Sequence, residues 1–488
     1  MSIPSSPSEP TALPAPVLRP IKDLPGPWAW PLVGNVLQIK PERVHQDIEQ
    51  LCEQYGPLMR VHFGRRPVLI VANHATVGSV LRERPSIFRR PSITAHVSTE
   101  MGGLPNVFIA EGADWRNQRR MVMAGFAPKP IRAYFPALVS VALRLQRRWH
   151  AAAAQGQSID LSADLKRYTV DIIAGLAFGQ EVNTLEAGDN VIQQHLDCIL
   201  PGIARRSFAL FPYWRYFKLP QDRKLDQSNA ALRIAVFDLI AQARARMQSD
   251  PALRDKPSNL LEAMIAAADQ PGSETDDDTV AGNVSTMLLA GEDTTANTIA
   301  WLLHLLHRNP YALQRATQEI QQLAPSSASF TAEQMDALVY LDAAVQEAMR
   351  LKPVGPFLPL EAVADTQIED VHVPKGSMIW CVMRRDSVSD EYFAQPAQFK
   401  PERWLESTVN KHISTPFGSG PRTCPGRYLA LLEIKIAVAM LLGSFELISV
   451  SPPDGNEANE LMGFVMSPVG LRMRLNTRTI AADSSQSR

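Results

Sequence analysis

The sequence predicts a single, mainly α-helical domain with a small β region. Apolar residues recur with helical periodicity over most of residues 130–323, whereas short β-prone runs occur near residues 58–72 and 372–380. The chain has 488 residues, of which 45% are hydrophobic and 20% are charged, which is enough to bury a large core. Because no internal repeat divides it, we expect one domain over residues 24–476.

The two ends of the chain are expected to lie outside this domain. Residues 1–23 are rich in Pro, Ser and Ala, and they contain no apolar run of the roughly 18 residues that a membrane-spanning helix requires. They are therefore predicted to be a disordered leader, which a proline-rich segment from Leu24 to Asn35 follows. Residues 477–488 are small and polar, which predicts a disordered tail.

Charge and cysteine content exclude several classes of function. The formal net charge of −1 gives no indication of a nucleic acid or an anionic membrane as a partner. Cys52, Cys198, Cys381 and Cys424 show no C-x-x-C spacing, and no secretory signal precedes them. This pattern favours a reducing, cytoplasmic location without disulfides or zinc.

The elements are expected in a definite order along the chain. Residues 58–63 and 68–72 are β-prone and flank the turn Gly64–Pro67, which predicts a hairpin. The helical patterns that follow are interrupted by loops near residues 155–157, 201–220 and 251–257. A further helix ends near Lys352, and a set of short strands, including residues 372–380, comes after it.

A central helix is predicted over residues 280–307. Residues 276–279 supply capping oxygens and negative charge at its start, and Asn309-Pro310 ends it. Within this helix lies the run Ala290–Thr295, which is unusually polar for apolar surroundings. Threonine hydroxyls there can bond the carbonyls of the preceding turn and open the helical ladder. The alternative is a solvated polar patch with a tolerated glycine.

Two side-chain pairs, one ionic and one cation–aromatic, lie on other predicted helices. Glu347 and Arg350 fall in the largely apolar helix Leu341–Leu351. An exposed pair at this spacing would contribute less than about 0.5 kcal/mol. Trp115 and Arg119 share a helix face, and the alternative for them is an exposed cation–aromatic contact.

The segment Phe417–Gly426 places a cysteine at the end of a glycine-rich loop. Residues 427–442 are mostly apolar and predict a buried helix directly after it. Cys424 therefore lies at a helix N-terminus, where N–H groups favour a thiolate. A thiolate in a rigid loop shielded from water is suited to be an axial iron ligand. The alternative is a buried free cysteine.

This loop fits the pattern Phe-x-x-Gly-x-Arg-x-Cys-x-Gly and resembles the haem-binding loop of cytochrome P450 monooxygenases. The resemblance implies that Cys424 ligates the iron of haem b and that Phe417 covers the sulfur. It also implies that Arg422 pairs with a haem propionate, since a guanidinium suits a carboxylate. The pattern defines Gly420 and Gly426, and the resemblance implies that Gly418 and Gly426 lie against the cofactor.

The polar run of the central helix, Ala290-Gly291-x-Asp293-Thr294, is similar to the oxygen-activation motif of the same family. The resemblance implies that Ala290 and Gly291 let haem and O2 approach the helix backbone. It assigns Asp293 and Thr294 to a relay that delivers protons for the cleavage of O2.

Two further motifs complete the resemblance. Phe399–Trp404 resembles the family segment whose arginine joins the Glu-x-x-Arg pair. It implies a structural triad behind the haem that supports the cysteine loop, made of Glu347, Arg350 and Arg403. Trp115 and Arg119 are implied to contact the haem propionates from the side opposite Arg422.

The resemblance runs from residue 24 to residue 474. It implies a triangular prism with the haem between the central helix and the cysteine-loop helix. The implied activity is that of a soluble, bacterial-type enzyme that inserts one oxygen atom of O2 into an apolar small molecule, by hydroxylation or epoxidation. Electrons are expected from a ferredoxin or flavodoxin-type donor and its reductase, through which NAD(P)H acts indirectly. We expect a monomer with no transmembrane anchor and no nucleic-acid partner.

Two alternatives compete with this function. An enzyme of the same fold that catalyses a reaction other than monooxygenation would tend to lack the acid–alcohol pair, which Asp293 and Thr294 supply here. A haem-based sensor without turnover usually carries an output domain, which is not evident within the 488 residues. Monooxygenation is therefore the preferred hypothesis.

The resemblance also implies a substrate pocket, and the sequence departs from the family pattern at two positions. The pocket residues are apolar and comprise Val354, Phe357, Leu358, Phe464 and Val465. Leu360 stands where an arginine usually binds a propionate, and Arg384 stands where a histidine is usual. We expect one propionate to be held by Arg384 or to be more exposed to solvent.

Overall fold

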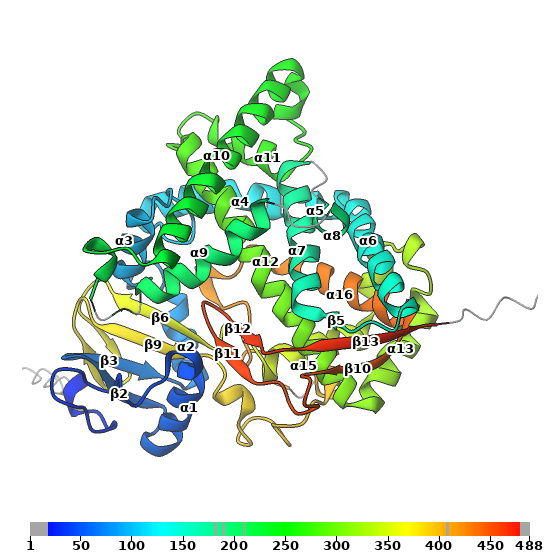
Figure 1. Cartoon of the computed structure of the whole chain (residues 1–488). Helices are drawn as coiled ribbons and strands as arrows, with labels where there is room; N and C mark the ends of the chain where they lie inside the picture. Colours follow the sequence, from blue (N-terminus) through cyan, green and yellow to red (C-terminus); the bar gives the residue numbers. More distant parts are fainter. Residues whose placement is uncertain are drawn as a thin grey trace, which may run out of the picture.

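The computed structural model describes residues 18–179, 183–187, 191–207, 209, 211–406 and 409–478. Helices make up most of these residues, and the largest sheet lies to one side of them (Figure 1). The prediction of a mainly α fold with a small β region is confirmed. No described helix is both long enough and apolar enough to cross a lipid bilayer.

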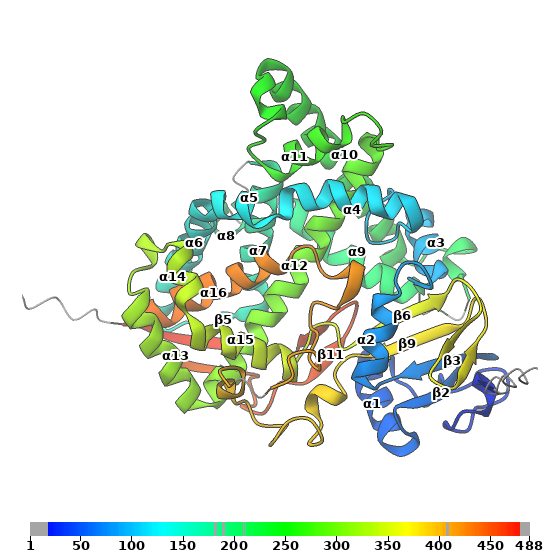
Figure 2. The same cartoon turned by 180° about the vertical axis from the view of Figure 1, so that it is seen from behind.

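A long helix, α12 (Asp277–Arg308), runs through the middle of the molecule (Figures 1 and 2). It packs against α7 (Leu161–Phe178), α15 (Val339–Leu351) and α16 (Arg427–Ser444). Buried residues lie on nearly all sides of α7 and α16, as expected for helices that other elements surround. These helices supply the larger of two hydrophobic cores.

The ends of α12 follow the capping signals of the sequence. The side chain of Asp276 accepts hydrogen bonds from both the backbone N–H and the hydroxyl of Thr279. Asn309 follows the last helical residue, and Pro310 starts the next helix. The predicted start at Val280 was three residues late, because the cap at Asp276 already allows a helical turn from Asp277.

A second group of helices lies above α12 and to its left in the view of Figure 1. It consists of α3 (Ser92–Glu100), α4 (Gly112–Phe126), α9 (Val191–Ser207), α10 (Pro220–Ser249) and α11 (Leu260–Ala268). The α9 helix packs on α10 and α3, α11 packs on α4, and α10 also packs on α12. The other described helices are α1 (Val44–Tyr55), α2 (His74–Arg82), α5 (Pro128–Ala133), α6 (Phe135–Ala154), α8 (Thr184–Ala187), α13 (Pro310–Leu323) and α14 (Ala332–Ala337).

The largest sheet has the strand order β2-β3-β9-β6-β4. Its strands are β2 (Leu58–Phe63), β3 (Arg66–Val71), β9 (Met378–Val382), β6 (Phe357–Ala362) and β4 (Phe88–Arg89). The predicted hairpin is confirmed, since β2 and β3 pair from Leu58↔Val71 to Phe63↔Arg66. The smaller hydrophobic core includes Leu69 and Val71 of this sheet.

The set of short strands predicted to include residues 372–380 contributes to two different sheets. Val371–Val373 forms β8, which pairs with β7 (Thr366–Ile368) and β1 (Arg19–Pro20). The chain then turns at Gly376, whose φ of +81° breaks the extended conformation, before β9 begins. The remaining strands are β5 (Ile159–Asp160), β10 (Phe445–Ser451), β11 (Glu460–Met462), β12 (Met466–Pro468) and β13 (Arg472–Thr477).

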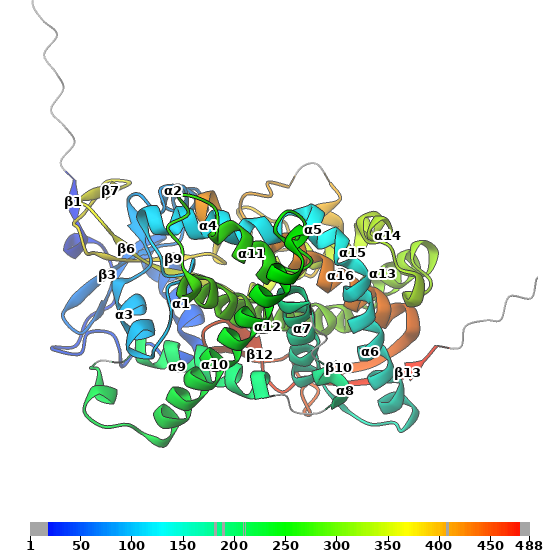
Figure 3. The same cartoon turned by 90° about the horizontal axis from the view of Figure 1, so that it is seen from above.

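The boundaries of the domain differ slightly from those expected. Arg19 pairs with Asp370 through both side chain and backbone, so the end of the expected leader belongs to the fold. At the other end, the Arg478 N–H donates to the carbonyl of Ser444. Figure 3 places β1 and β13, the two strands nearest the ends, on opposite sides of the molecule. The rest of the expected leader and tail, residues 1–17 and 479–488, lies outside the described residues.

Candidate active site

The loop before α16 is shaped by two glycines and one backbone hydrogen bond. Gly418 and Gly420 have φ angles of +68° and +72°, in the left-handed region. At Gly420 a Cβ atom would lie 2.6 Å from the carbonyl oxygen of Leu81, so no side chain fits there. The Cys424 N–H donates to the carbonyl of Phe417 over 3.0 Å and closes the loop.

Cys424 lies in a crevice. The residue is exposed, yet burial is the largest influence on the pKa of its thiol, and it raises that pKa. A sulfur that solvent can touch while protein still surrounds it does not lie on an open surface. Hydrogen bonds from the Gly426 and Arg427 N–H groups and the charge of Arg119 act in the opposite direction and favour the thiolate. Metal coordination would remove the proton outright.

Phe417 and Gly426 are two further residues of the predicted loop. Phe417 is partly buried against the core, and the Arg427 guanidinium lies 5.6 Å from the centre of its ring. Gly426 precedes the first residue of α16 and caps the helix. A Cβ atom at Gly426 would lie 4.0 Å from Cys424 Sγ, so this glycine adjoins the candidate ligand.

On α12, Ala290 and Thr294 face a cavity. Ala290 is exposed although most residues of the helix are buried. The Thr294 hydroxyl donates to the Ala290 carbonyl over 2.7 Å, and the Thr298 hydroxyl repeats this bond to Thr294 over 2.8 Å. The expected bonding of threonine hydroxyls to the preceding turn is therefore present, although the helix continues without a break.

Gly291 has a packing role that the sequence did not suggest. A Cβ atom there would lie 3.2 Å from Cγ1 of Ile173, on α7. The residue is absent from the described lining of the cavity, whereas its neighbour Ala290 is present. The glycine thus lets α7 approach α12 closely, and Ala290 supplies the small surface on the cavity side.

Asp293 is held by a lysine from the neighbouring helix. Its Oδ1 lies 2.9 Å from Nζ of Lys166 on α7, and both side chains are partly exposed. The Asp293 side chain is absent from the described cavity lining, whereas Thr294 contributes to it. The two residues of the predicted relay therefore point to different surroundings, the alcohol toward the cavity and the acid toward a cation.

The predicted arginines gather beside the cysteine loop. Arg422 lies over the ring of the buried Trp115, with the guanidinium 4.7 Å from the ring centre. Arg119 donates to the carbonyl of Thr423 over 2.7 Å. Trp115 and Arg422 are thus in contact, whereas the sequence analysis expected them on opposite sides of a cofactor.

Two further arginines join Arg422. Arg84 is buried, and burial together with the charge of Arg422 lowers its pKa to about 10. Arg90 lies 3.3 Å above the ring of Phe108, and burial, Arg84 and Arg422 lower its pKa well below the ordinary value. Glu111 offsets part of this charge, with a 2.5 Å bond from Arg422.

The structure brings Glu347, Arg350 and Arg403 together in a buried cluster. Arg350 donates to both carboxylate oxygens of Glu347 over 2.8 Å, and Arg403 donates to Oε1 over 2.9 Å. Although burial favours the neutral acid, bonds and charges from Arg350 and Arg403 outweigh it and lower the pKa of Glu347. Trp404 donates a further bond of 2.8 Å, so the pair is not the exposed one that its spacing alone would suggest.

A mainly apolar cavity of about 220 Å³ opens onto Ala290 and Thr294. Phe464 and Val465, predicted to line the pocket, do so. The wall also includes Ile199 of α9, Leu232 of α10, Leu289 of α12, and Met101 and Leu104 from the segment after α3. The cavity and the cysteine crevice are the two parts that a haem enzyme of this type needs.

The other three predicted pocket residues do not line the described cavity. Phe357 stacks on Trp380 at 5.4 Å between ring centres, and Leu358 packs against the smaller core of the sheet. The backbone carbonyl of Val354 accepts a hydrogen bond from Met466. The start of β6 is therefore occupied by contacts within the sheet and with β12.

Comparison with known proteins agrees with this geometry. The family model described as Cytochrome P450 matches residues 24–475, which is most of the chain. The chain belongs to the cytochrome P450 family. Its fold is that of the family, and we conclude that it is a cytochrome P450 monooxygenase.

Relatives of this P450 come from several lineages. A self-sufficient cytochrome P450 monooxygenase of Oidiodendron maius (strain Zn) is 26% identical over 94% of the chain and 44% of the relative's own length. Cytochrome P450 3A6 of Oryctolagus cuniculus is 26% identical over 86% of the chain and 85% of the relative. The human steroid 17-alpha-hydroxylase/17,20 lyase is 27% identical over 89% and 87%. The chain thus spans less than half of the first relative, and these relatives give no support to the expected bacterial type.

The residues beside Cys424 fit haem. Two nitrogens of Arg84 and one of Arg422 are buried without a hydrogen-bond partner among the described residues. Three clustered guanidinium groups beside Glu111 suit a ligand with two carboxylates, which haem carries as propionates. The free thiol of Cys424 lies beside these groups, and Ala290 leaves room on the α12 side.

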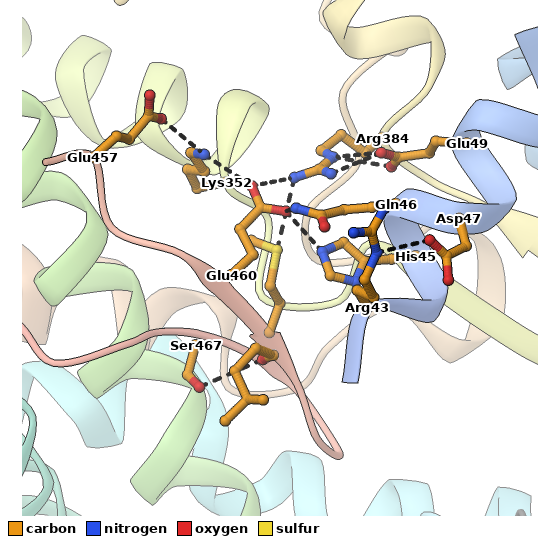
Figure 4. A network of polar contacts seen from close by, with 12 residues as sticks. Arg43, His45, Gln46, Asp47, Glu49, Lys352, Arg384, Glu457, Glu460 and Ser467 are labelled. Atoms are coloured by element: carbon orange, nitrogen blue, oxygen red, sulfur yellow. Dashed lines mark hydrogen bonds and ion pairs between the residues drawn. The ribbon is translucent and has the colours of Figure 1, made fainter. Parts of the chain in front are cut away.

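The expectation that Arg384 would bind a propionate is wrong. Arg384 is buried in a separate polar network, where it contacts Glu49 at 2.7 Å and Glu460 at 2.8 Å (Figure 4). Leu360, in the position of the usual arginine, is buried in the smaller core. Arg84 and Arg90 supply the positive charge instead, near Arg422.

Several functional candidates escaped the sequence analysis. Lys166, Arg84, Asn229 and Arg233 carry no motif, since each gains its neighbours only through the packing of distant elements. The proximity of Arg90 to Arg84 likewise gave no local signal in the sequence. The sequence contained one indirect indication of these cations. Leu360 stands where the family pattern has an arginine, so one positive charge of the pattern is missing there.

Proposed function

We propose that this P450 inserts one oxygen atom of O2 into an apolar small molecule, by hydroxylation or epoxidation. The observation that carries the proposal is the cavity of about 220 Å³, whose mainly apolar wall ends on Ala290 and Thr294. An apolar cavity of this kind favours apolar substrates, because binding removes the surface of the substrate and the wall of the cavity from water.

The roles of the loop residues follow from their contacts. Haem b, when bound through Cys424, supplies the chemistry that activates O2. Phe417 shields the sulfur from water, and Gly418 and Gly426 keep the loop close to it. Trp115 holds the Arg422 guanidinium flat, and Arg119 braces the loop at Thr423.

Asp293 and Thr294 are proposed to move protons into the cavity. The Thr294 hydroxyl gives its hydrogen to Ala290, which leaves its oxygen free to accept from a water or from the substrate side. Asp293 exchanges protons with solvent near Lys166 and passes them inward by rotation of its side chain. The triad of Glu347, Arg350 and Arg403 takes no part in this chemistry and supports the cysteine loop.

Electrons are proposed to arrive from a ferredoxin or flavodoxin-type protein with its own reductase, which NAD(P)H reduces. The proposal follows from the family, whose chemistry needs electrons that the haem domain does not itself supply. We further propose a monomer in a reducing, cytoplasmic compartment, because all four cysteines are free.

The proposal is tested by reconstitution with a surrogate ferredoxin and reductase under isotopically labelled O2. We expect one labelled oxygen atom in each product molecule and consumption of NAD(P)H in proportion. Product without label would favour an enzyme of the same fold with a different reaction. Tight ligand binding without any product across a broad apolar panel would favour a sensor.

A further inference from the structure

The cavity is elongated along α12. Its lining includes one face of that helix, Gly282, Ser285, Thr286, Leu289, Ala290 and Thr294. From residue 282 to residue 294 the helix rises about 18 Å, at 1.5 Å per residue. A ligand that reaches Thr294 at one end can therefore extend to the N-terminal part of α12 at the other.

At that far end, α10 contributes two nitrogen-bearing side chains to the wall. Asn229 and Arg233 lie one helical turn apart and both line the cavity. The side-chain nitrogen of Asn229 is buried without a hydrogen-bond partner, alone among the described lining residues. Two other polar side chains of the wall are engaged: Asn106 donates to Leu104, and Thr286 donates to Gly282. Asn229 thus has an unused donor at the cavity wall.

Arg233 adds a positive charge beside it. Its nearest acid is Asp278 at 3.8 Å, which is beyond hydrogen-bond distance, and both side chains are about half exposed at 47% and 48%. Such a pair contributes little and leaves the guanidinium open to another anion. Asp278 lies one helical turn before Gly282, so this contact also places Arg233 at the end of the cavity away from Thr294.

We propose that Asn229 and Arg233 bind the carboxylate of an amphiphilic substrate whose apolar body fills the cavity toward Ala290 and Thr294. A partly exposed site suits a charged head, which keeps some of its water, whereas burying the apolar chain is favourable. Anchoring the head at this end directs oxidation to carbon atoms remote from the carboxylate. The inference rests on the proposed function and deepens it to a substrate class.

The test compares a series of saturated fatty acids, from decanoic to palmitic acid, with their methyl esters. Dissociation constants come from the shift of the haem Soret band in the loaded protein. We expect every acid of the series that binds to have a lower dissociation constant than its methyl ester. Arg233→Leu and Asn229→Leu should weaken acid binding about five- to tenfold and leave ester binding nearly unchanged. Asp278→Asn should tighten acid binding, because it removes the competing carboxylate.

Arg223→Ala is the matched control, since it removes an exposed arginine of the same helix that is not part of the cavity wall. It should change neither dissociation constant. Acids that bind no better than esters, or variants that weaken both ligands equally, would overturn the carboxylate site. Each variant is first checked for the carbon monoxide spectrum of a thiolate haem. A wild-type protein without that spectrum would instead contradict the proposed function.

Discussion

Nζ of Lys166 lies 2.9 Å from Oδ1 of Asp293, and this ion pair joins α7 to the acid of the oxygen-activation motif. The side chains are 27% and 20% exposed, so solvent reaches the pair from outside the substrate cavity. Thr294, the next residue, faces the cavity. The motif thus connects two compartments, and Lys166 controls which way the acid points.

Replacing Lys166 should alter proton delivery without altering the haem site. We expect Lys166→Met to change the turnover rate about tenfold, because Asp293 loses its partner. The solvent isotope effect on the turnover rate should change as well. Lys166→Arg should largely restore the wild-type values. The carbon monoxide spectrum and the substrate-induced Soret shift should remain unchanged in both variants. Wild-type kinetics and isotope effect in Lys166→Met would show that the pair is only structural.

Asp293→Asn and Thr294→Ala should have different effects. Asp293→Asn should mainly slow turnover, since it removes the acid that resupplies protons. Thr294→Ala should raise the ratio of peroxide released to product formed, since it removes the hydroxyl on the cavity side. NAD(P)H consumed, peroxide and product are measured together. If both variants keep the wild-type ratio of product formed to NAD(P)H consumed, a function other than monooxygenation would again have to be considered.

Cys424→Ser should abolish the red-shifted carbon monoxide band of a thiolate haem. The buried Cys381→Ser and Cys52→Ser variants serve as controls, because neither thiol lies in the loop and burial raises the pKa of each to about 12. They should retain the band wherever they fold. A persisting band in Cys424→Ser would mean that another side chain holds the iron.

Glu347→Ala should leave Arg350 buried and unpaired, at a cost of about 3–5 kcal/mol. We expect low haem content and a lower unfolding temperature. Glu186→Ala, which breaks the exposed pair with Arg147, is a matched control that should change stability by less than about 1 kcal/mol. Normal haem content with only slower turnover in Glu347→Ala would argue against a structural triad.

Glu433 on α16 predicts a pH dependence of stability. The side chain is buried, and burial raises its pKa from 4.5 to about 8, opposed by a hydrogen bond with Thr295. Because the folded state holds this proton more tightly than the unfolded state, the contribution is complete below pH 4.5 and is lost as the pH rises through 8. Glu433→Gln should remove this slope and stabilise the protein by about 3 kcal/mol at neutral pH. Unfolding temperatures measured between acid and alkaline pH check it, and an unchanged slope would contradict it.

The sequence predicted the features that short contiguous patterns encode. The hairpin at residues 58–71, the cap at Asp276 and the loop at Cys424 depend on neighbours in the chain, and each lies where it was expected. Contacts between side chains of distant elements could not be predicted from such patterns. Lys166 meets Asp293 only because α7 packs on α12, and that packing depends on Gly291, which the motif assigned to another purpose.

The errors have a similar cause. Arg384 was expected to bind a propionate in place of the arginine that the family carries where Leu360 stands, but Glu49 and Glu460 come from two other elements to neutralise it. Phe357 and Leu358 are apolar and adjacent to a helix of the site, yet the sheet takes both side chains into its own contacts. Residue type alone did not distinguish a pocket wall from the interior of a sheet.

The network around Glu460 has a consequence for how the chain acquires its structure. His45 and Glu460 lie 415 residues apart, and their 2.7 Å contact ties the first helix to the hairpin that carries Phe464 and Val465. Closing so long a loop is slow, because contacts between residues far apart in the sequence carry a large loop-closure cost. The substrate wall is therefore among the last parts to assemble, after the helices around α12 have already formed.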